Sequence, residues 1–324
     1  MHISGLSELL EAFNSSFWPV YSCTDSLKTC FYQHDAIGGL AWIYVAISAY
    51  CLVFAELTGN YSKVDQIWSV TPWAYCWYLL AHWQHHHAGE IHERLLVICI
   101  LTSIWGFRLT YNFWRRGGYG NLITHEEDYR WSILRKKISS RVLFSLFNAT
   151  FIAPYQNLIL SLIALPAYQV MNGETSCNWK DIALCFAFIA FIGMETISDQ
   201  QHWNFHEKKY GVTAQQRKLH PDQDVKDGFF QSGLFCFSRH PNYFAEQSVW
   251  MVIYLFSLTH TPISSISDLF NVYFLGELLL ISLFQGSVAF GESITMSKYP
   301  KYKEYQNRTS KCFPFFPNER KKSA

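Results

Sequence analysis

The feature of this sequence that most constrains its fold is a series of long apolar runs separated by polar segments. A helix of about 20 apolar residues is long enough to cross the hydrocarbon core of a bilayer. The runs are Ala36–Leu57, Val64–Leu80, Leu95–Trp114, Val142–Tyr168, Ile182–Ser198, Tyr243–Leu258 and Leu269–Phe290. Hydrophobic residues make up 50% of the chain. The sequence therefore predicts an all-α, polytopic transmembrane helix bundle of about seven spans.

Two of these runs carry features that interrupt a simple span. The second run contains Asp65, Gln66 and Pro72, which are polar or helix-breaking residues. The fourth run is longer than one crossing needs, and it contains Pro154, where a re-entrant break would fit. Six spans rest on stronger patterns than the seventh.

The distribution of positive charge predicts an orientation. If all seven runs cross the membrane, then the segments 115–141 and 200–239 lie on one side together with the residues after Gly291. These segments hold most of the 26 Lys and Arg residues. Because cytosolic loops are enriched in Lys and Arg, this side is predicted to be cytosolic and the N-terminus lumenal.

This topology divides the chain into three parts. Residues 1–35 are predicted to form a lumenal tail, residues 36–312 the transmembrane bundle, and residues 313–324 a cytosolic tail. The mixed basic, acidic and aromatic residues of segments 115–141 and 298–305 predict interfacial helices on the cytosolic side.

The two ends of the chain carry signals that match this orientation. The N-terminal segment has no basic stretch followed by a cleavage site, so we do not expect a removable signal peptide. A glycosylation acceptor pattern begins at Asn14, and Cys23 and Cys30 can pair in an oxidising lumen. Lys321 and Lys322 form a dilysine signal, which predicts an endoplasmic reticulum membrane protein when the C-terminus is cytosolic.

The stretch GFFQSGLFCFSRHPNYFAEQ, residues 228–247, places a dense polar cluster directly before an apolar run. Pro241 fits the first turn of a helix, where the free N–H groups form a site for an anion such as phosphate. Asn242 and Glu246 lie one turn apart and share a helix face. The alternative is an interfacial cap whose Arg and His residues face lipid headgroups.

Two further polar clusters are expected at the cytosolic face, at residues 199–209 and 292–308. In the first, Asp199 and His206 fall on one helix face. Carboxylates, amides and tyrosines on such faces suit a ribose and a carboxamide.

The basic residues of these clusters suit the rest of a dinucleotide. Arg239, His240 and Arg308 can bind phosphates. No GxGxxG follows a strand, so a dinucleotide pocket here would lack a Rossmann fold.

A histidine cluster raises a rival hypothesis. The loop HWQHHHAGEIHER contains His82, His85, His86, His87 and His92. HxxHH is the spacing of membrane di-iron enzymes, and His202 and His206 add an HxxxH pattern. The predicted topology places these two groups on opposite sides of the membrane. We therefore predict no metal site, and interpret the loop as a polar lumenal segment.

Asp65 is a candidate site residue because a carboxylate at the edge of the hydrocarbon is costly unless it pairs or faces a polar cavity. The alternative is a helix N-cap at headgroup level. The nine cysteines contain no close CxxC pair, so a zinc site is not expected.

Several motifs together resemble one family. They are VDQIWSVTPW, WGFRLTYNFWRRGGYG, DQQHWNFHEK, SGLFCFSRHPNYFAE and FGESITMSKYPKYKEYQNRTSKCFPFFP, and they cover most of the chain from Asp65 onward. The chain is similar to the membrane steroid 5α-reductase superfamily, in the branch called domain of unknown function 1295. The resemblance implies a helical bundle that binds NADPH near its cytosolic face and passes hydride to a conjugated double bond of a lipid.

The resemblance also implies roles for individual residues. Cofactor contacts fall on Asp199, Asn242, Tyr243, Glu246 and Glu292, followed by Arg239, His240 and His206. At the substrate end the pattern departs from the steroid-reducing members, and the nearest counterparts are Asp65 and either Trp105 or Tyr111. Asp65 or Tyr111 would hydrogen-bond the substrate carbonyl as enolate charge develops.

Two other function classes remain open. Membrane methyltransferases that use S-adenosylmethionine share the RHPxY pattern, but Ala245 stands where they usually have Gly. A non-enzymatic membrane scaffold would show the same spans. The expected partners are the membrane and a lipid taken from it, with no nucleic acid; the oligomeric state, the substrate and the proton donor are not determined by the sequence.

Overall fold

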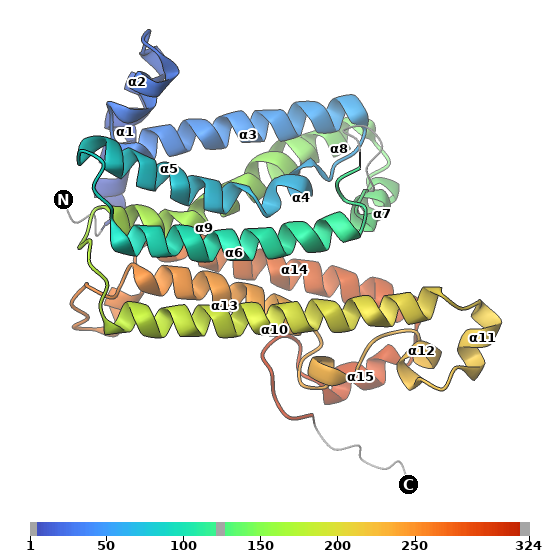
Figure 1. Cartoon of the computed structure of the whole chain (residues 1–324). Coiled ribbons are helices and arrows are strands. Elements are labelled where there is room, and N and C mark those ends of the chain that lie inside the picture. The colour runs from blue at the N-terminus through green and yellow to red at the C-terminus, as the bar shows by residue number, and fades with distance from the viewer. Residues whose placement is uncertain (1–4, 121–126, 318–324) are drawn as a thin grey trace. The chain divides into compact units, whose positions relative to one another are not determined.

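The computed structural model describes residues 5–120 and 127–317, and these form helices joined by short loops (Figure 1). Across the described residues the only pairing outside helices is an isolated parallel bridge between Ser238 and Ser310. The all-α prediction is confirmed. Contacts divide the chain into unit 1, Met1–Cys185 with Met251–Leu280, and unit 2, Phe186–Trp250 with Ile281–Ala324.

Within the described part of the chain, five helical segments are long and apolar enough to cross a membrane. They are α3 (Ala36–Thr58), α6 (Glu93–Arg115), the continuous segment Arg141–Met171, α10 (Trp179–Tyr210) and the segment Val272–Lys298, which contains η4 (Val272–Phe274) and α14 (Leu275–Lys298). Each matches one of the predicted runs. The chain is therefore a multi-pass membrane protein, and the expected count of about seven spans is not confirmed.

The two remaining runs form shorter helices. The run Val64–Leu80 is split into α4 (Lys63–Trp68) and α5 (Thr71–His86), because the chain turns at Ser69 and Pro72 takes a place in the first turn of α5. The run Tyr243–Leu258 forms α13 (Pro241–Phe256), which has 16 residues. A helix of that length falls short of a full crossing.

The fourth span differs from the expectation in another way. The predicted break at Pro154 is wrong, because the chain stays helical from α8 (Arg141–Phe147) through the π-helix η1 (Asn148–Tyr155) into α9 (Gln156–Met171). A π-helical turn accommodates a residue that lacks an N–H donor without interrupting the helix.

Unit 1 is built around α3, α5, α6 and α9. Figure 1 shows α3, α5 and α6 lying side by side, and α5 packs against both α6 and α9. Helix α3 is capped at its N-terminus by Asp35, whose carboxylate accepts from the Ile37 N–H at 2.9 Å, and at its C-terminus by Gly59 in the left-handed conformation with φ 68°. The Tyr168 hydroxyl donates to the same Asp35 carboxylate at 2.8 Å, which joins α9 to the start of α3.

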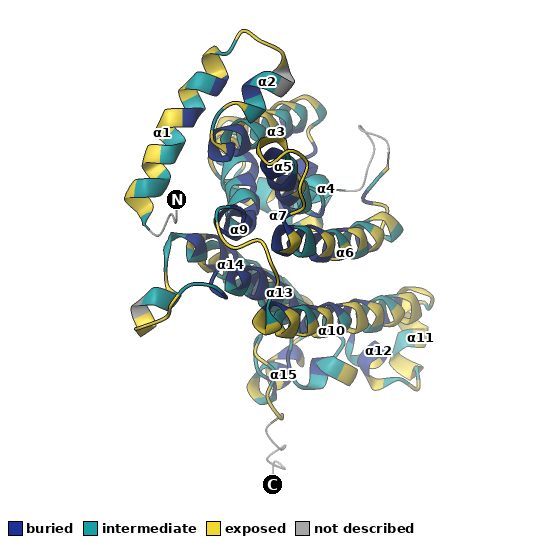
Figure 2. Ribbon diagram, turned by 60° about the vertical axis from the view of Figure 1, so that its left-hand side comes forward, coloured by how far each residue is buried: buried dark blue, intermediate teal, exposed yellow. Residues whose placement is uncertain are grey.

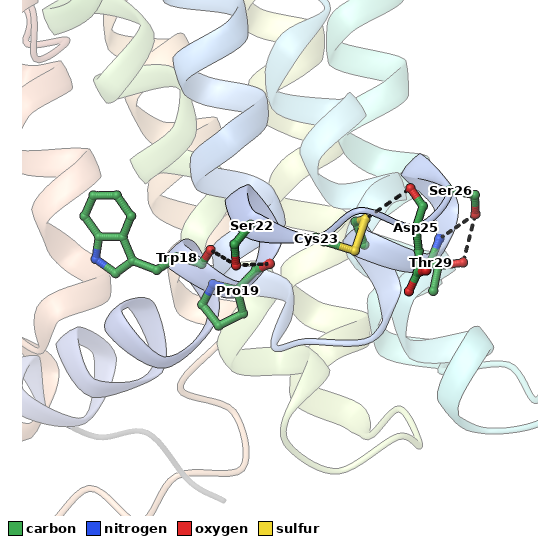
Figure 3. The surroundings of a disulfide bond; sticks show 8 residues. Trp18, Pro19, Ser22, Cys23, Asp25, Ser26 and Thr29 are labelled. Carbon is green, nitrogen blue, oxygen red and sulfur yellow. Dashed lines mark hydrogen bonds between the residues drawn. A yellow bond between two sulfur atoms is a disulfide. The ribbon is translucent and has the colours of Figure 1, made fainter.

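The N-terminal helix α1 (Leu6–Ser22) lies against α3 and is followed by α2 (Leu27–Tyr32) (Figure 2). A disulfide joins Cys23 to Cys30 across the turn between them (Figure 3). The glycosylation acceptor Asn14 is exposed in the middle of α1, whereas the Ser16 hydroxyl of the same pattern is buried and donates to the Ala12 carbonyl at 2.6 Å. The structure thus contains the predicted disulfide and leaves glycosylation as a prediction.

Unit 2 holds the C-terminal part of α10 and four short helices. These are α11 (Ala214–Leu219), α12 (Gln223–Asp227), η2 (Gly233–Cys236) and α15 (Tyr302–Arg308), packed with parts of α13 and α14. Phe229, Tyr302 and Tyr305 form a small aromatic core. Lys209 donates to the Gly228 carbonyl at 2.7 Å, which fixes the end of α10 to the loop before η2.

The predicted interfacial segment 115–141 contains only one helix among its described residues, α7 (Tyr129–Lys137), and residues 121–126 lie outside the described residues. The dilysine signal at Lys321 and Lys322 also lies outside them. The topology and the location therefore remain predictions at these points.

Candidate functional site

Glu292 on α14 is the centre of a buried polar network in unit 2. Its carboxylate accepts from Arg239 Nε at 2.7 Å and from Nη2 at 3.2 Å. These two bonds fix the orientation of the guanidinium plane relative to the carboxylate plane. His240 Nε2 lies 3.0 Å from the same carboxylate, the Tyr302 hydroxyl donates to it at 3.2 Å, and Gln306 donates at 2.8 Å. Arg239 and Glu292 are 9% and 8% exposed. The network is therefore a rigid brace, which we call the Glu292 brace.

The local sequence explains why Arg239 reaches Glu292. Ser238 ends the segment after η2 and pairs with Ser310, and the Arg239 N–H donates to the Ser310 carbonyl at 2.9 Å. The guanidinium also donates to the Gln306 and Thr309 carbonyls at 3.1 and 2.5 Å. Helix α13 then starts at Pro241. The brace thus connects the first turn of α13 with α14, α15 and the segment that follows α15.

Tyr302 shows the electrostatic effect of this burial. Removal from water raises the pKa of the Tyr302 hydroxyl above its usual range, and the neighbouring Glu292 carboxylate acts in the same direction. The hydroxyl therefore stays protonated and donates to Glu292. Tyr302 and Gln306 lie within the polar cluster predicted at residues 292–308, but neither was assigned an individual role, although the tyrosines at 299, 302 and 305 follow a spacing that places two of them on one helix face.

The first turns of α13 place further polar residues beside α10. Asn242 donates to the Asp199 carboxylate of α10 at 3.4 Å. The Tyr243 ring lies between His240, at a centroid distance of 5.5 Å, and Phe284 of α14, at 4.8 Å. The structure therefore brings together Asp199, Asn242, Tyr243 and His240 from among the predicted cofactor residues.

Buried carboxylates also lie on α10 and α13. Asp199 and Glu246 are 7% and 5% exposed, and Glu195, one turn before Asp199, is also buried. Buried carboxylates are costly unless they are paired or bind a ligand. No role was predicted for Glu195, although it lies four residues before Asp199 and therefore on the same helix face.

His206 occupies a separate part of unit 2. Its Nε2 lies 3.2 Å from Nε2 of His202, and its ring stacks on Tyr210 with centroids 5.4 Å apart. Phe235 stacks on the other member of the pair, His202. The cofactor role of His206 therefore remains a prediction.

In unit 1 the predicted substrate residues lie in different settings. Trp131 Nε1 donates to the Asp65 carboxylate at 3.2 Å. Protein atoms that crowd this carboxylate raise its pKa above the usual range, and Asp128 acts in the same direction while Arg130 opposes it. Tyr111 is 57% exposed on α6, with the Arg115 guanidinium over its ring. Asp65 is thus bonded to a neighbouring helix, whereas Tyr111 lies at the surface of α6.

The histidine cluster has a structural role in unit 1. His82 Nε2 lies 2.8 Å from the His34 carbonyl, and His86 Nε2 lies 2.7 Å from the Tyr32 carbonyl. These contacts hold α2 and the loop after it against the end of α5. Among residues 5–120 and 127–317, no group of three or more His, Cys, Asp or Glu side chains is arranged to hold a metal ion.

A family described as "Protein of unknown function (DUF1295)" matches residues 51–309. An uncharacterized protein of Schizosaccharomyces pombe is 35% identical over 264 residues, which is 79% of this chain and 73% of the yeast protein. No solved structure matches.

Proposed function

Because the chain belongs to the DUF1295 family, which is associated with steroid 5α-reductase-like membrane proteins, we propose that it is a membrane-embedded, NADPH-dependent reductase of a conjugated double bond in a lipid. The observation that carries this proposal is the polar face that α10 and α13 form in unit 2. There Asn242 donates to Asp199 at 3.4 Å, and Glu246 is buried one turn further along α13.

The chemistry of these side chains fits the sugar and amide parts of NADPH. Carboxylates such as Asp199 and Glu246 accept hydrogen bonds from ribose hydroxyls, and the Asn242 amide can both donate to and accept from a carboxamide. The Tyr243 ring is stacked on His240 and Phe284, so its proposed contribution is the hydroxyl, a group that can donate and accept hydrogen bonds. The Glu292 brace would hold the first turn of α13 in place. We therefore assign Arg239 and Glu292 a positioning role, in addition to their proposed contacts with the cofactor.

Bound NADPH would supply a hydride to an electron-poor alkene carbon. The protein would then have to stabilise the enolate charge that develops on the substrate carbonyl, which needs a preplaced hydrogen-bond donor. Asp65 suits that role because its raised pKa favours the protonated form, which can donate. Tyr111 is the second candidate for this donor. The substrate class would be an enone steroid, a sterol or an enoyl-type lipid taken from the bilayer.

We further propose an endoplasmic reticulum membrane location with a lumenal N-terminus and a cytosolic C-terminus. The Cys23–Cys30 disulfide supports this orientation, because structural disulfides persist in oxidising compartments such as the lumen. Protease protection of a C-terminal tag in sealed microsomes would contradict it.

The decisive experiment measures binding of NADPH and S-adenosylmethionine side by side to the purified full-length protein. We expect NADPH to bind, and Asn242→Ala and Glu246→Gln each to weaken binding by about tenfold, since each removes one hydrogen-bonding group worth about 1 kcal/mol or more. Asn204→Ala, at an exposed position of α10, is the matched control and should bind as the unchanged protein does.

The methyltransferase alternative is tested in the same measurement. The pattern Arg239-His240-Pro241, with Tyr243 two residues later, is the observation that favours it. Binding of S-adenosylmethionine without binding of NADPH would replace the reductase proposal.

A further inference from the structure

A cavity of about 340 Å³ lies within unit 1 between α1, α3 and α9. Its walls are aliphatic and aromatic, and they include Leu9 and Phe13 of α1, Leu40 and Ala41 of α3, and Leu158 and Leu162 of α9. This volume falls within the range of sites for small molecules, about 300 to 1,000 Å³. The cavity is separate from the polar residues proposed above, all of which lie on other helices.

The few polar atoms of the lining are already bonded within the protein. The Ser161 hydroxyl donates to the Leu158 carbonyl at 2.8 Å, and the Tyr44 hydroxyl donates to the Pro154 carbonyl at 3.3 Å. A water molecule needs two to four polar partners in such a place, whereas the lining has only these two hydroxyls, and the hydrogen of each is already donated within the protein. The occupant that fits the cavity is therefore pure hydrocarbon.

The position of the cavity shows where this hydrocarbon comes from. Helix α3 and the segment Arg141–Met171 are both candidate membrane spans, so two of the three walls cross the bilayer. The third wall, α1, exposes Leu10 and the aromatic residues Trp18 and Tyr21, and exposed Trp and Tyr are typical of the membrane interface. The cavity is also not fully enclosed. Lipid acyl chains are thus the hydrocarbon that surrounds it.

Helix α1 is fixed in place as the cover of the cavity. The Trp42 Nε1 donates to the Phe17 carbonyl at 2.9 Å, and the Trp42 ring stacks on Phe17 with centroids 4.6 Å apart. At Gly38 an added Cβ would lie 2.7 Å from the backbone of Ser16, so only glycine permits this close approach of α3 to α1. The Cys23–Cys30 disulfide fixes the turn at the end of α1 (Figure 3).

The charge at this end of unit 1 selects the lipid headgroup. Before Lys63 the sequence contains one lysine, Lys28, and no arginine, whereas α1 carries Glu8 and Glu11 next to the cavity-lining leucines. An anionic headgroup is disfavoured beside these carboxylates, and an ammonium group is favoured.

We propose that the cavity binds one acyl chain of a zwitterionic phospholipid, with α1 as its cover and the ammonium headgroup beside the acidic side chains of α1. The site is an accessory lipid site. It does not depend on the reductase proposal, because its evidence lies in unit 1 and its test needs no catalytic activity.

The test uses the full chain in nanodiscs that contain a trace of phosphatidylcholine with a photoreactive group at the end of one acyl chain. After irradiation, mass spectrometry locates the adducts. We expect them to be concentrated in peptides covering residues 9–13 and 158–165. Phosphatidylglycerol with the same labelled chain should give several-fold fewer adducts, because the acidic side chains of α1 repel its anionic headgroup.

Variants of the cavity provide the control. Ala41→Phe places a ring in the part of the cavity that several methylene groups of the acyl chain would occupy. It should lower the adducts in these peptides by about tenfold or more. Ala46→Phe makes the same change at an exposed position of α3 and should leave them unchanged. Leu162→Ala enlarges the cavity and should raise them, which keeps the test valid if Ala41→Phe does not fold.

Three outcomes would overturn the proposal. In the first, adducts are spread evenly over the exposed apolar residues of the spans. In the second, Ala41→Phe folds and labels these peptides as strongly as Ala46→Phe does. In the third, phosphatidylglycerol labels them as well as phosphatidylcholine, which would contradict the choice of headgroup.

Discussion

Arg94–Asp181 in unit 1 and Arg239–Glu292 in unit 2 are both buried ion pairs, but their surroundings differ. Arg94 and Asp181 are 2% and 1% exposed. Arg94 also donates to the Thr259 hydroxyl and to the Phe256 carbonyl, the latter at 2.6 Å. The Thr259 hydroxyl donates to Asp181 at 3.0 Å. This pair therefore joins α6 and α10 to the end of α13, and its hydrogen-bond partners are side chains and carbonyls that hold these helices together.

The Arg239–Glu292 pair in unit 2 is less deeply buried. Glu292 accepts from Arg239, but it also faces the His240 ring, whose side chain is 21% exposed. The brace lies directly before the turn that carries Asn242 and Tyr243. Burial of an ion pair therefore does not by itself identify a functional site, because the more deeply buried pair has only structural partners. What distinguishes the second pair is that its partners lead to polar side chains on α10 and α13.

The largest effect is expected at the closed pair. Arg94→Leu leaves Asp181 as a buried carboxylate without its partner, which costs about 3–5 kcal/mol. We expect a large loss of folded protein, measured by thermal unfolding in detergent. The double variant Arg94→Leu with Asp181→Leu removes both charges and should recover most of the stability. A single variant as stable as the unchanged protein would show that the pair is not structural.

A smaller loss of stability, with a specific loss of binding, is expected at the brace. Glu292→Gln keeps the shape but removes the charge that Arg239 needs, at a cost of about 1.5–3 kcal/mol. NADPH affinity should fall by about tenfold, because the first turn of α13 loses its support. Glu304→Gln, at an exposed position of α15, is the matched control and should change neither quantity. Equal NADPH affinity in Glu292→Gln and Glu304→Gln would contradict the positioning role.

The sequence predicted some parts of the molecule better than others, for physical reasons. Apolar length predicted the helices of all five candidate spans, since hydrocarbon burial requires it. It could not separate α4 from α5, because the turn at Ser69 depends on packing. The same criterion overestimated α13, whose 16 residues are apolar but short.

For the site residues too, local patterns could be predicted from the sequence, whereas contacts between distant residues could not. The polar cluster at residues 238–246 could be found because it directly precedes an apolar run. The partnership of Arg239 with Glu292 joins residues 53 positions apart, so no local pattern encodes it. Asp65 and Tyr111 received equal weight in the sequence, and only the fold shows that Asp65 is crowded by protein while Tyr111 is exposed.

The carboxylate of Asp65 predicts a pH dependence of stability. Because its pKa is raised in the folded protein above the usual value of 3.8, folding is favoured when the group is protonated, and that contribution is lost as the pH rises through the folded pKa. Asp65→Asn keeps an acceptor for Trp131 but does not titrate. Relative to the unchanged protein it should therefore gain stability as the pH rises above about 4. The check is the unfolding temperature of both proteins measured against pH. Parallel curves for Asp65→Asn and the unchanged protein would contradict a raised pKa of Asp65.

The smallest effect is expected at the histidine cluster. His86 contacts the Tyr32 carbonyl at 2.7 Å, His87 contacts the Trp83 carbonyl at 2.8 Å, and the His85 ring stacks on Tyr32. Replacing all three by alanine removes two hydrogen bonds worth about 0.5–1.5 kcal/mol each. We therefore expect a small decrease in stability and unchanged NADPH binding, because these side chains hold only α2 and the end of α5. If the unchanged protein instead contained stoichiometric iron, and the variant lost this iron together with its activity, the cluster would be a metal centre and the di-iron hypothesis would replace the reductase proposal.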